Sequence, residues 1–407
     1  MAGIATDVTT EFTAQQLQEK ELVLNLSNRE LLGENILRLQ IITTGSALRK
    51  GISLLELFAE NKTRRTLIYR SELHAFRSVE EEQTHCLYFL EKGIKRHLAG
   101  YTYPSDKELP TKSATPLPEA LLKKTTRLFQ RDNWFCNVIH SPIEVVALNK
   151  GKKAAKAILP PDKHSLMADP FGIIHKGREF VLFERQESGK KGEIACFLEG
   201  EVTTVFKSEY HLSYPFLLEK DGKIYCIPEQ HESGRLDLYE FNPESRSISF
   251  KKTILKDFAA TDPTVVLHKN KYWLFCTDTA DQGANSRLHL FYADHPEGEW
   301  KPHRQNPIKI SVKGSRPGGT LFTHEGHLYR PGQNSAETYG GSLIIYRIDQ
   351  LTESEFSETA VNEIFPGDFG SGFAGIHTIS KFGNKTLIDL KQKVFSFRNI
   401  LQYLRKT

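Results

Sequence analysis

The sequence is poor in cysteine, methionine and tryptophan. Its 407 residues include only five cysteines, and no two of them are spaced as a CxxC motif. Three of them, Cys196, Cys226 and Cys276, fall in expected strands, where a buried thiol packs as a small hydrophobic side chain. Thiols in this arrangement argue against a disulfide framework and indicate a reducing compartment.

A strong excess of charge and a long apolar run are also absent. The 54 basic and 50 acidic residues leave a net charge of +4, which is too balanced to indicate nucleic acid or a membrane surface as partner. The polar N-terminus carries no apolar signal segment, and no stretch reaches transmembrane length. We therefore expect a cytoplasmic protein with no nucleic-acid partner and no transmembrane segment.

What the chain does contain is a repeated β-hairpin. In the clearest copy, the strands Phe216–Glu219 and Lys223–Ile227 flank Asp221-Gly222, and this dipeptide is a strong short-range hairpin signal. The same unit recurs with turns near residues 177, 222, 270, 326 and 383. A period of roughly 45–57 residues with short strands is typical of a β-propeller, so five hairpins predict five blades.

The stretches outside the repeat complete the expected fold, which is mainly β: a five-bladed β-propeller preceded by a small α/β N-terminal domain. Residues 1–100 predict that domain, with strands at 21–27, 35–42, 53–58 and 63–69 and a helix at 79–98. Residues 101–130 predict a linker and a short basic helix. The propeller is expected over residues 131–407, with 133–139 as an outer strand that opens the first blade or closes the ring.

Polar residues recur at one position of the repeat. The first strand of each propeller blade lines the central channel, so the starts of these strands should converge at one end of it. Polar residues at the ends of the second strands should join them, Glu229 and Gln333 among them. Carboxylates around such a funnel suit glycosyl transfer, which needs a base or nucleophile, an acid, and a group that tunes the acid. The best catalytic trio is Asp169, Glu229 and Asp262.

Other residues of the funnel are expected to bind substrate. These are His211, Tyr214, Arg316, Arg330, Gln333, Tyr339 and His377. Structural alternatives stand beside every assignment: Asp-Pro is a common turn device, Glu229 and the arginines can form rim salt bridges, and histidines and aromatic residues can belong to the core. Asp169 and Asp262 occupy the same position of the repeat, where the other blades have different polar residues. This difference favours a role beyond turn formation. No cofactor is expected, and a metal ion on the axis near His377 is the open alternative.

Several motifs in this order resemble a known module. They are Ala168-Asp-Pro-Phe, His211-Leu-Ser-Tyr-Pro-Phe, Ile227-Pro-Glu229, Asp262-Pro-Thr, Arg316-Pro-Gly-Gly, Tyr329-Arg-Pro-Gly-Gln333 and His377-Thr378. Over about residues 130–400 the chain resembles the propeller of the N-terminal part of plant glucosamine inositolphosphorylceramide transferases and of bacterial formyltransferase-like proteins. Residues 21–27 and 54–60 are similar to the later part of the formyltransferase-like domain, so the N-terminal domain would be its remnant.

The module itself resembles the five-bladed furanosidase-like superfamily of arabinanases, xylosidases and invertases. This resemblance implies catalytic acids on the inner blade strands. Our leading hypothesis is a carbohydrate-active propeller that hydrolyses or transfers a glycosyl unit in cell-surface glycan or glycolipid metabolism. Asp169 would be the base or nucleophile and Glu229 the acid, while Asp262 would orient substrate or tune the acid; the last two roles are exchangeable. The second hypothesis is a non-catalytic glycan-binding or scaffold module that works with a separate glycosyltransferase.

Overall fold

The chain divides into two units by its internal contacts, Met1–Lys124 and Thr125–Thr407. The computed structural model describes residues 21–24, 36–44, 52–60, 65–74, 88–89, 92–94, 130–159 and 165–395. The linker and basic helix expected at 101–130 therefore lie almost entirely outside the described residues. None of the described helices is long and apolar enough to cross a membrane.

The described part of the first unit is an antiparallel sheet in the order β1-β2-β3-β4. Its strands are β1 (Glu21–Leu24), β2 (Ile36–Thr44), β3 (Ile52–Glu60) and β4 (Arg65–His74). In β3, Leu55 and Leu57 are fully buried on one face, and Glu56 between them is buried on the other face, where it pairs with Arg70. Of the helix expected at 79–98, only residues 88–89 and 92–94 are described, and they are helical. The α/β character of this region stays a prediction.

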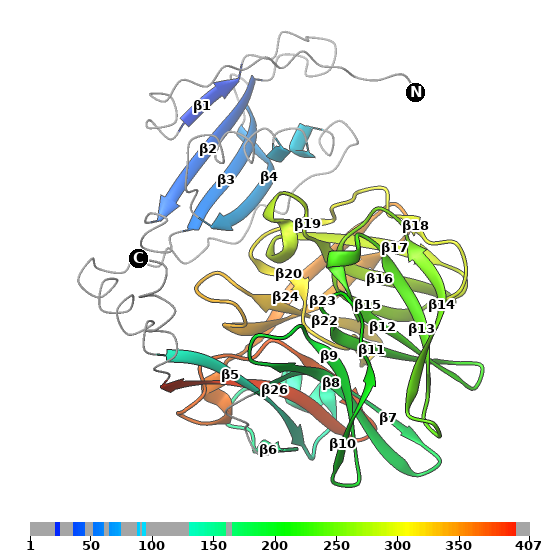
Figure 1. Cartoon of the computed structure of the whole chain (residues 1–407). Helices are drawn as coiled ribbons and strands as arrows, with labels where there is room; N and C mark the ends of the chain where they lie inside the picture. The colour runs from blue at the N-terminus through cyan, green and yellow to red at the C-terminus, as the bar shows by residue number, and fades with distance from the viewer. Residues whose placement is uncertain are drawn as a thin grey trace. The chain divides into compact units, whose positions relative to one another are not determined.

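The second unit contains the predicted five-bladed β-propeller, which the structure confirms (Figure 1). Four of its five sheets run from the inner strand outward in sequence order. Blade 1 contains β7 (Ser165–His175), β8 (Arg178–Glu187), β9 (Glu193–Leu198) and β10 (Glu201–Phe206). Blade 2 contains β11 (Ser213–Lys220), β12 (Lys223–Glu229), β13 (Leu236–Asn242) and β14 (Ser247–Leu255). Each of the five predicted hairpin turns separates two paired strands.

The next two blades are less regular at their inner and outer edges. Blade 3 contains β15 (Ala260–His268), β16 (Lys271–Asp278), β17 (Arg287–Ala293), β18 (Lys301–Pro302) and β19 (Lys309–Ile310). Blade 4 contains β20 (Lys313–Pro317), β21 (Phe322–His324), β22 (His327–Asn334), β23 (Ser342–Leu351) and β24 (Phe356–Ile364). The inner edge of blade 4 is split, because β20 and β21 pair with different parts of β22.

The fifth blade closes the ring with strands from both ends of the unit. Its order is β25 (Ile379–Phe382), β26 (Lys385–Phe395), β5 (Gln130–Ile139) and β6 (Lys156–Ala157). The strand predicted at 133–139 is thus an outer strand that pairs with the C-terminal β26. Because β7 of blade 1 contacts both β25 and β11, the last blade lies beside the first. This pairing covers the edges that β5 and β26 would otherwise expose, and it joins the two ends of the propeller within one blade.

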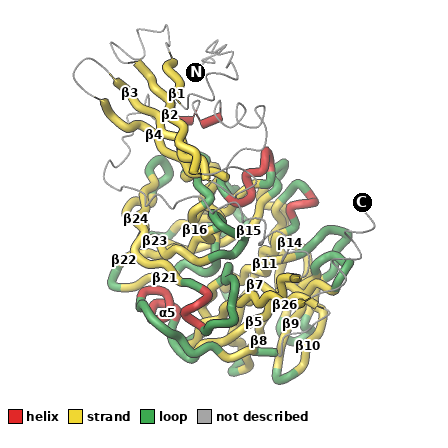
Figure 2. Tube along the Cα trace, turned by 90° about the vertical axis from the view of Figure 1, so that its left-hand side faces the viewer, coloured by secondary structure: helices red, strands yellow, loops and turns green. Residues whose placement is uncertain are grey.

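The core of the second unit lies between neighbouring blades. Apolar side chains of successive sheets form continuous clusters; one of them contains Phe171, Phe216 and Leu274 from three blades. Helical segments in this unit are short, as Figure 2 shows. They are α5 (Ile143–Leu148), η2 (His231–Ser233), η3 (Ala280–Asn285) and η4 (Pro366–Phe369). Strands therefore supply almost all of the framework that positions the inner polar residues.

Candidate functional site

Three inner strands share an unusual backbone step. Asp169, Tyr214 and Asp262 have φ angles of 52°, 45° and 48°, and proline follows each of them. Strand pairing shifts register at the same place in each blade, as in a β-bulge. A non-glycine residue with positive φ is uncommon, and a following proline restricts its backbone further, so the rest of the fold must stabilise this step.

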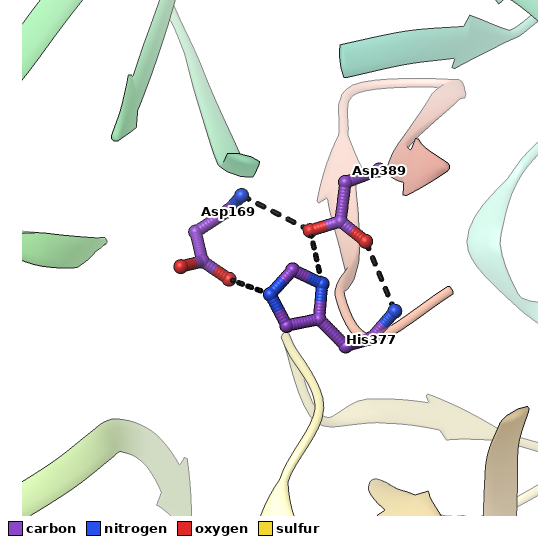
Figure 3. Close-up of side chains that lie close together, drawn as sticks. All are labelled: Asp169, His377 and Asp389. Atoms are coloured by element: carbon purple, nitrogen blue, oxygen red, sulfur yellow. Dashed lines mark hydrogen bonds and ion pairs between the residues drawn. The ribbon is translucent and has the colours of Figure 1, made fainter. Parts of the chain in front are cut away.

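A carboxylate from the preceding blade stabilises the step at Asp169. The Asp169 N–H donates to Asp389 Oδ2 at 3.0 Å. Asp389 Oδ1 accepts the N–H groups of His377 and Thr378, each at 3.0 Å. Asp389 Oδ2 also pairs with His377 Nδ1 at 2.7 Å. Figure 3 shows His377 between the two aspartates, with Nδ1 toward Asp389 and Nε2 toward Asp169.

Only one oxygen of the Asp169 carboxyl has hydrogen-bonding partners among the described residues. Its Oδ1 accepts the Thr378 hydroxyl at 2.6 Å and lies 3.5 Å from His377 Nε2. Within the described part of the chain, no side-chain or backbone donor bonds to its Oδ2, which points away from His377 in Figure 3. We call Asp169, His377, Thr378 and Asp389 the Asp169 cluster; all four residues are buried.

Burial and neighbouring charges set the ionisation of the Asp169 cluster. Burial raises the pKa of Asp169 to about 7, against the opposing pull of His377. Burial disfavours a charged imidazole, yet Asp389 and Asp169 raise the pKa of His377 to about 9. Burial also opposes ionisation of Asp389, but His377 and two backbone N–H donors lower its pKa. At neutral pH the cluster therefore contains an ionised Asp389, a charged His377 and an Asp169 carboxyl poised between its two states.

The same cluster bears on the open question of a metal ion near His377. One ligand atom from each of Asp169, His377 and Asp389 lies within 4.8 Å of the others, a spacing that can hold a cation. However, both Asp389 oxygens already accept N–H groups, and both His377 nitrogens face carboxylates. These contacts form an ion-paired triad, and a cation at this position stays the open alternative, which requires a neutral imidazole.

A second cluster surrounds Asp262, which has the same left-handed backbone conformation before a proline. The Asp262 N–H donates to Glu229 Oε2 at 3.0 Å, so a carboxylate from the preceding blade again stabilises the left-handed residue. Arg316 donates to Asp262 Oδ2 through Nε at 2.6 Å and to Oδ1 through Nη2 at 3.0 Å. Gln333 Nε2 donates to Asp262 Oδ2 as well. We call Glu229, Asp262, Arg316 and Gln333 the Asp262 cluster.

Both carboxylates of the Asp262 cluster have their oxygens occupied. Glu229 Oε2 also accepts Arg316 Nη2 at 3.3 Å, and Glu229 Oε1 pairs with His231 Nδ1 at 2.8 Å. Although burial opposes ionisation, His231 and Arg316 lower the pKa of Glu229 to about 2. Burial raises the pKa of Asp262, and Arg316 works against that rise. Glu229 is therefore ionised at neutral pH, while the two-point contact with arginine holds Asp262 in place.

Tyr339 joins the two clusters. Its ring lies 5.2 Å from the His377 ring, edge to face, and the Arg316 guanidinium carbon lies 5.3 Å from the Tyr339 ring centre. The Trp134 ring packs against both residues, with its centre 4.1 Å from that of His377 and 6.3 Å from that of Tyr339. Tyr339 is 40% exposed, although the acidic groups beside it are buried. The residue is thus partly accessible, whereas burial raises the pKa of its hydroxyl well above the usual value.

The other predicted binding residues lie in different settings. Tyr214 is fully buried, and its hydroxyl hydrogen-bonds to Thr264 Oγ1 at 2.8 Å. Arg330 is also fully buried and forms a two-point contact with Glu358 at 2.8 and 2.7 Å. His211 is partly exposed, with Nε2 3.2 Å from Glu184. The structure thus brings Asp169, His377, Tyr339 and the Asp262 cluster together, but it places Tyr214 and Arg330 in the interior.

Sequence reasoning missed Asp389, the residue that links Asp169 to His377. It ends the fifth hairpin repeat, close to the place where Glu229 ends the second. This recurrence was the available signal. Thr378 and His231 were also missed as partners, and only the packing of adjacent blades reveals these contacts.

Comparison with known proteins gives the family. The family model described as "Glucosamine inositolphosphorylceramide transferase 1, N-terminal" matches residues 152–367, more than half of the chain. Glucosamine inositolphosphorylceramide transferase 1 of Oryza sativa subsp. japonica is 33% identical over 244 residues, which cover 54% of this chain and 33% of that protein. The Arabidopsis thaliana protein of the same name is 34% identical over 210 residues, 48% of this chain and 27% of its own. The match thus spans about a third of these relatives' length.

Solved structures give weaker likenesses. The exo-β-1,3-galactanase 1,3Gal43A from Clostridium thermocellum is 15% identical, with a TM-score of 0.40 over 48% of this chain and 49% of that one. The Cellvibrio cellulosa α-L-arabinanase is 11% identical, with a TM-score of 0.36 over 84% and 94%. At these scores the likenesses say nothing about the substrate, and the formyltransferase-like resemblance stays a prediction. The family match confirms the other resemblance: this chain belongs to the family of the N-terminal region of glucosamine inositolphosphorylceramide transferase 1.

Proposed function

We propose that the chain is a carbohydrate-active propeller that hydrolyses or transfers a glycosyl unit in cell-surface glycan or glycolipid metabolism. The observation that carries this proposal is the Asp169 carboxyl: one of its oxygens has no described donor, and its pKa of about 7 lies near the operating pH. A group of this kind exchanges a proton efficiently at neutral pH. Tyr339, a partly exposed residue of the same site, is the aromatic side chain against which a sugar ring would pack.

In this proposal Asp169 is the base or nucleophile, and the Asp262 cluster orients the substrate. A general acid must be protonated before it reacts, and a pKa of about 2 argues against Glu229 in that role. Exchanging the roles gives the acid to Asp262, whose pKa is raised, but Arg316 and Gln333 occupy both of its oxygens. The transferase names of the relatives support a glycosyl-bearing substrate, such as a sugar, glycan or glycolipid.

Turnover of a panel of p-nitrophenyl glycosides by the Asp169→Asn variant tests the proposal. We expect turnover to fall about 10²–10⁴-fold, the usual contribution of a general acid or base, with binding retained. The matched control is Asp294→Asn, which changes an aspartate whose side chain is 91% exposed. Unchanged turnover in the Asp169 variant would remove the catalytic role.

The second candidate function is a non-catalytic glycan-binding or scaffold module that works with a separate glycosyltransferase. It is favoured by the occupied oxygens of Glu229 and Asp262, which leave Asp169 as the open carboxyl of the described site. Under this alternative the wild-type chain binds a glycan but shows no turnover, and Asp169→Asn changes neither property.

A cytoplasmic location also stays a proposal. It is supported by Cys136, Cys196, Cys226 and Cys276, which are buried free thiols in the described part of the chain.

A further inference from the structure

Exposed apolar side chains occur where blades 4 and 5 meet. Helix α5 contacts strands of both blades, β21 and β24 in one and β25 and β26 in the other. Ile143 and Val146 of this helix are buried, whereas Val145 is 44% exposed. In β24 and the turn after it, Val361 is 40% exposed and Phe365 is 51% exposed. We call these three exposed side chains the apolar patch.

Hydrogen bonds hold the segments of the apolar patch together. The Asn362 side chain on β24 donates to the Ala147 carbonyl on α5 at 2.7 Å. The Asp368 carboxylate in η4 accepts the Phe365 N–H at 3.0 Å, and the Asp368 carbonyl accepts the Lys153 N–H at 2.8 Å. The Lys153 ammonium also lies 3.8 Å from the Asp368 carboxylate. The loop that follows α5 is therefore held beside η4 and the apolar patch.

That loop carries a local excess of positive charge. Residues 149–156, which we call the lysine loop, contain four lysines and no acidic residue. Lys153 is paired in the contact just described, whereas Lys150, Lys152 and Lys156 are exposed and have no ion-pair partner among the described residues. The near balance of charge over the whole chain thus conceals three uncompensated cations beside an apolar surface.

This combination matches the chemistry of an anionic bilayer surface. Headgroups attract lysines, and the boundary between headgroups and acyl chains accepts aromatic and aliphatic side chains. Gly367 and Gly372, in the segment after Phe365, have only open space where a side chain would lie. Phe365 can therefore approach a flat surface without a clash. A bilayer adapts to scattered apolar points, whereas a stable protein interface needs a larger and closely packed core.

We propose that the apolar patch and the lysine loop dock the propeller on the surface of an anionic lipid bilayer. The three apolar side chains enter the headgroup boundary, and the three free lysines contact the charged headgroups. This inference goes beyond the proposed glycosyl chemistry and does not depend on it, because neither the patch nor the loop contains a residue of the Asp169 or Asp262 cluster.

Flotation of the full chain over a lipid titration tests the inference. One vesicle type is phosphatidylcholine alone, and the other is an equal mixture of phosphatidylcholine and phosphatidylserine. We expect the chain to float only with the mixed vesicles, and added salt to weaken this binding. Neutralising the three free lysines (Lys150→Gln, Lys152→Gln and Lys156→Gln together) should lower the partition coefficient about 100-fold. Phe365→Ser should lower it about fivefold, because the side chain is half exposed before it docks.

Matched controls make the same chemical changes elsewhere on the propeller. The triple variant Lys176→Gln, Lys190→Gln and Lys207→Gln removes three exposed lysines, each of which pairs with a glutamate. Phe250→Ser changes another exposed phenylalanine, on β14. Both control variants should bind the mixed vesicles as the wild type does.

Three outcomes would overturn the inference. The first is a control variant that loses as much binding as its partner, because overall charge or apolarity would then explain the effect. The second is a wild-type chain that is folded by circular dichroism but floats with neither vesicle type. The third is a wild-type dimer that Phe365→Ser dissociates in analytical ultracentrifugation while no vesicle is bound, which would make the patch an interface between two copies. Glycoside turnover is measured separately, so either proposal can fail while the other stands.

Discussion

The Asp169 and Asp262 clusters share the same left-handed backbone step, but they differ in how the aspartate side chain is paired. In each, a left-handed aspartate before a proline donates its N–H to a carboxylate from the preceding blade. At Asp262 the side chain is then held by Arg316 at two points, whereas at Asp169 one oxygen has no described partner. The repeat thus supplies the geometry, and the identity of the nearby cation decides whether the carboxyl is fixed or available.

Comparing the two clusters shows which of their residues stabilise the backbone. Glu229 and Asp389 accept the N–H of a strained residue, so their first role is to position the backbone. Burial raises the pKa of each aspartate, and His377 at Asp169 and Arg316 at Asp262 oppose that rise. A catalytic role is therefore more compatible with Asp169 than with either of the two residues that hold the strained steps.

Removing the cation of the Asp262 cluster should have the largest effect on the free energy of unfolding. Arg316→Met leaves Asp262 and Glu229 as buried carboxyls without a counter-charge, so the free energy of unfolding should fall by about 3–5 kcal/mol. Urea denaturation at pH 7 measures it. The matched control is Arg330→Met, which removes another buried arginine paired with a carboxylate; it should destabilise the fold but leave ligand binding intact. A loss under about 1 kcal/mol for Arg316→Met would indicate that Asp262 is already neutral.

The next effect concerns pH: the Asp169 cluster should lose a stabilising contribution at alkaline pH, and the Asp262 cluster should lose one at acid pH. The pKa of His377 rises from its ordinary 6.5 to about 9, so its stabilising contribution is complete below pH 6.5 and is lost as the pH rises through 9. A shift of this size corresponds to at most about 3 kcal/mol. Glu229, with a lowered pKa of about 2, contributes fully above pH 4.5 and loses its contribution as the pH falls toward 2.

Unfolding free energies measured from pH 2 to pH 10 test this pair. His377→Gln should flatten the alkaline limb of the profile, and Glu229→Gln should flatten the acid limb. The imidazole carbon shifts of His377 give the titration directly by NMR. A midpoint near the ordinary value would contradict the ion-paired triad.

A smaller effect should differ in sign between the two aspartates. Because the pKa of Asp169 is raised from 3.8 to about 7, folding is penalised above pH 3.8 and the penalty is complete above pH 7. At pH 8, Asp169→Asn should therefore stabilise the fold by about 1–2 kcal/mol, and at pH 4 the gain should vanish. Burial also raises the pKa of Asp262, so Asp262→Asn relieves a similar penalty, but it leaves Arg316 without its two-point partner. We expect the loss of this contact to outweigh the relief and to destabilise the fold at pH 8 by about 1–2 kcal/mol. Equal signs at pH 8 would remove the contrast between the clusters.

Most of the fold could be predicted from the sequence, because hairpin turns and strand alternation are local features. Five turn dipeptides mark where strands reverse, and their spacing gives the number of blades: Lys176-Gly177, Asp221-Gly222, Lys269-Asn270, Glu325-Gly326 and Gly383-Asn384. Ring closure by residues 130–139 could be foreseen only as one of two options, because the pairing with β26 joins segments about 250 residues apart.

The candidate site could be predicted only in part. Position in the repeat predicted that Asp169, Asp262, Arg316 and His377 would converge, but it could not give their partners. Burial separates Tyr214 and Arg330 from the accessible Tyr339, and it depends on packing between blades that no local pattern encodes. The open oxygen of Asp169 and the paired oxygens of Asp262 likewise follow from three-dimensional contacts.

The smallest expected effect tests whether the two clusters act as one site. Tyr339 touches both His377 and Arg316 and is partly exposed, so Tyr339→Ala should lower the free energy of unfolding by less than about 0.5 kcal/mol. Losing its cation–π and stacking surface should weaken binding of a polyol probe by about 1 kcal/mol, or roughly fivefold. Tyr339→Phe keeps the ring and should bind within twofold of wild type. If Tyr339→Phe and Tyr339→Ala lower the affinity measured by NMR equally, the hydroxyl and not the ring contacts the probe. The aromatic ring then does not join the two clusters into a sugar site.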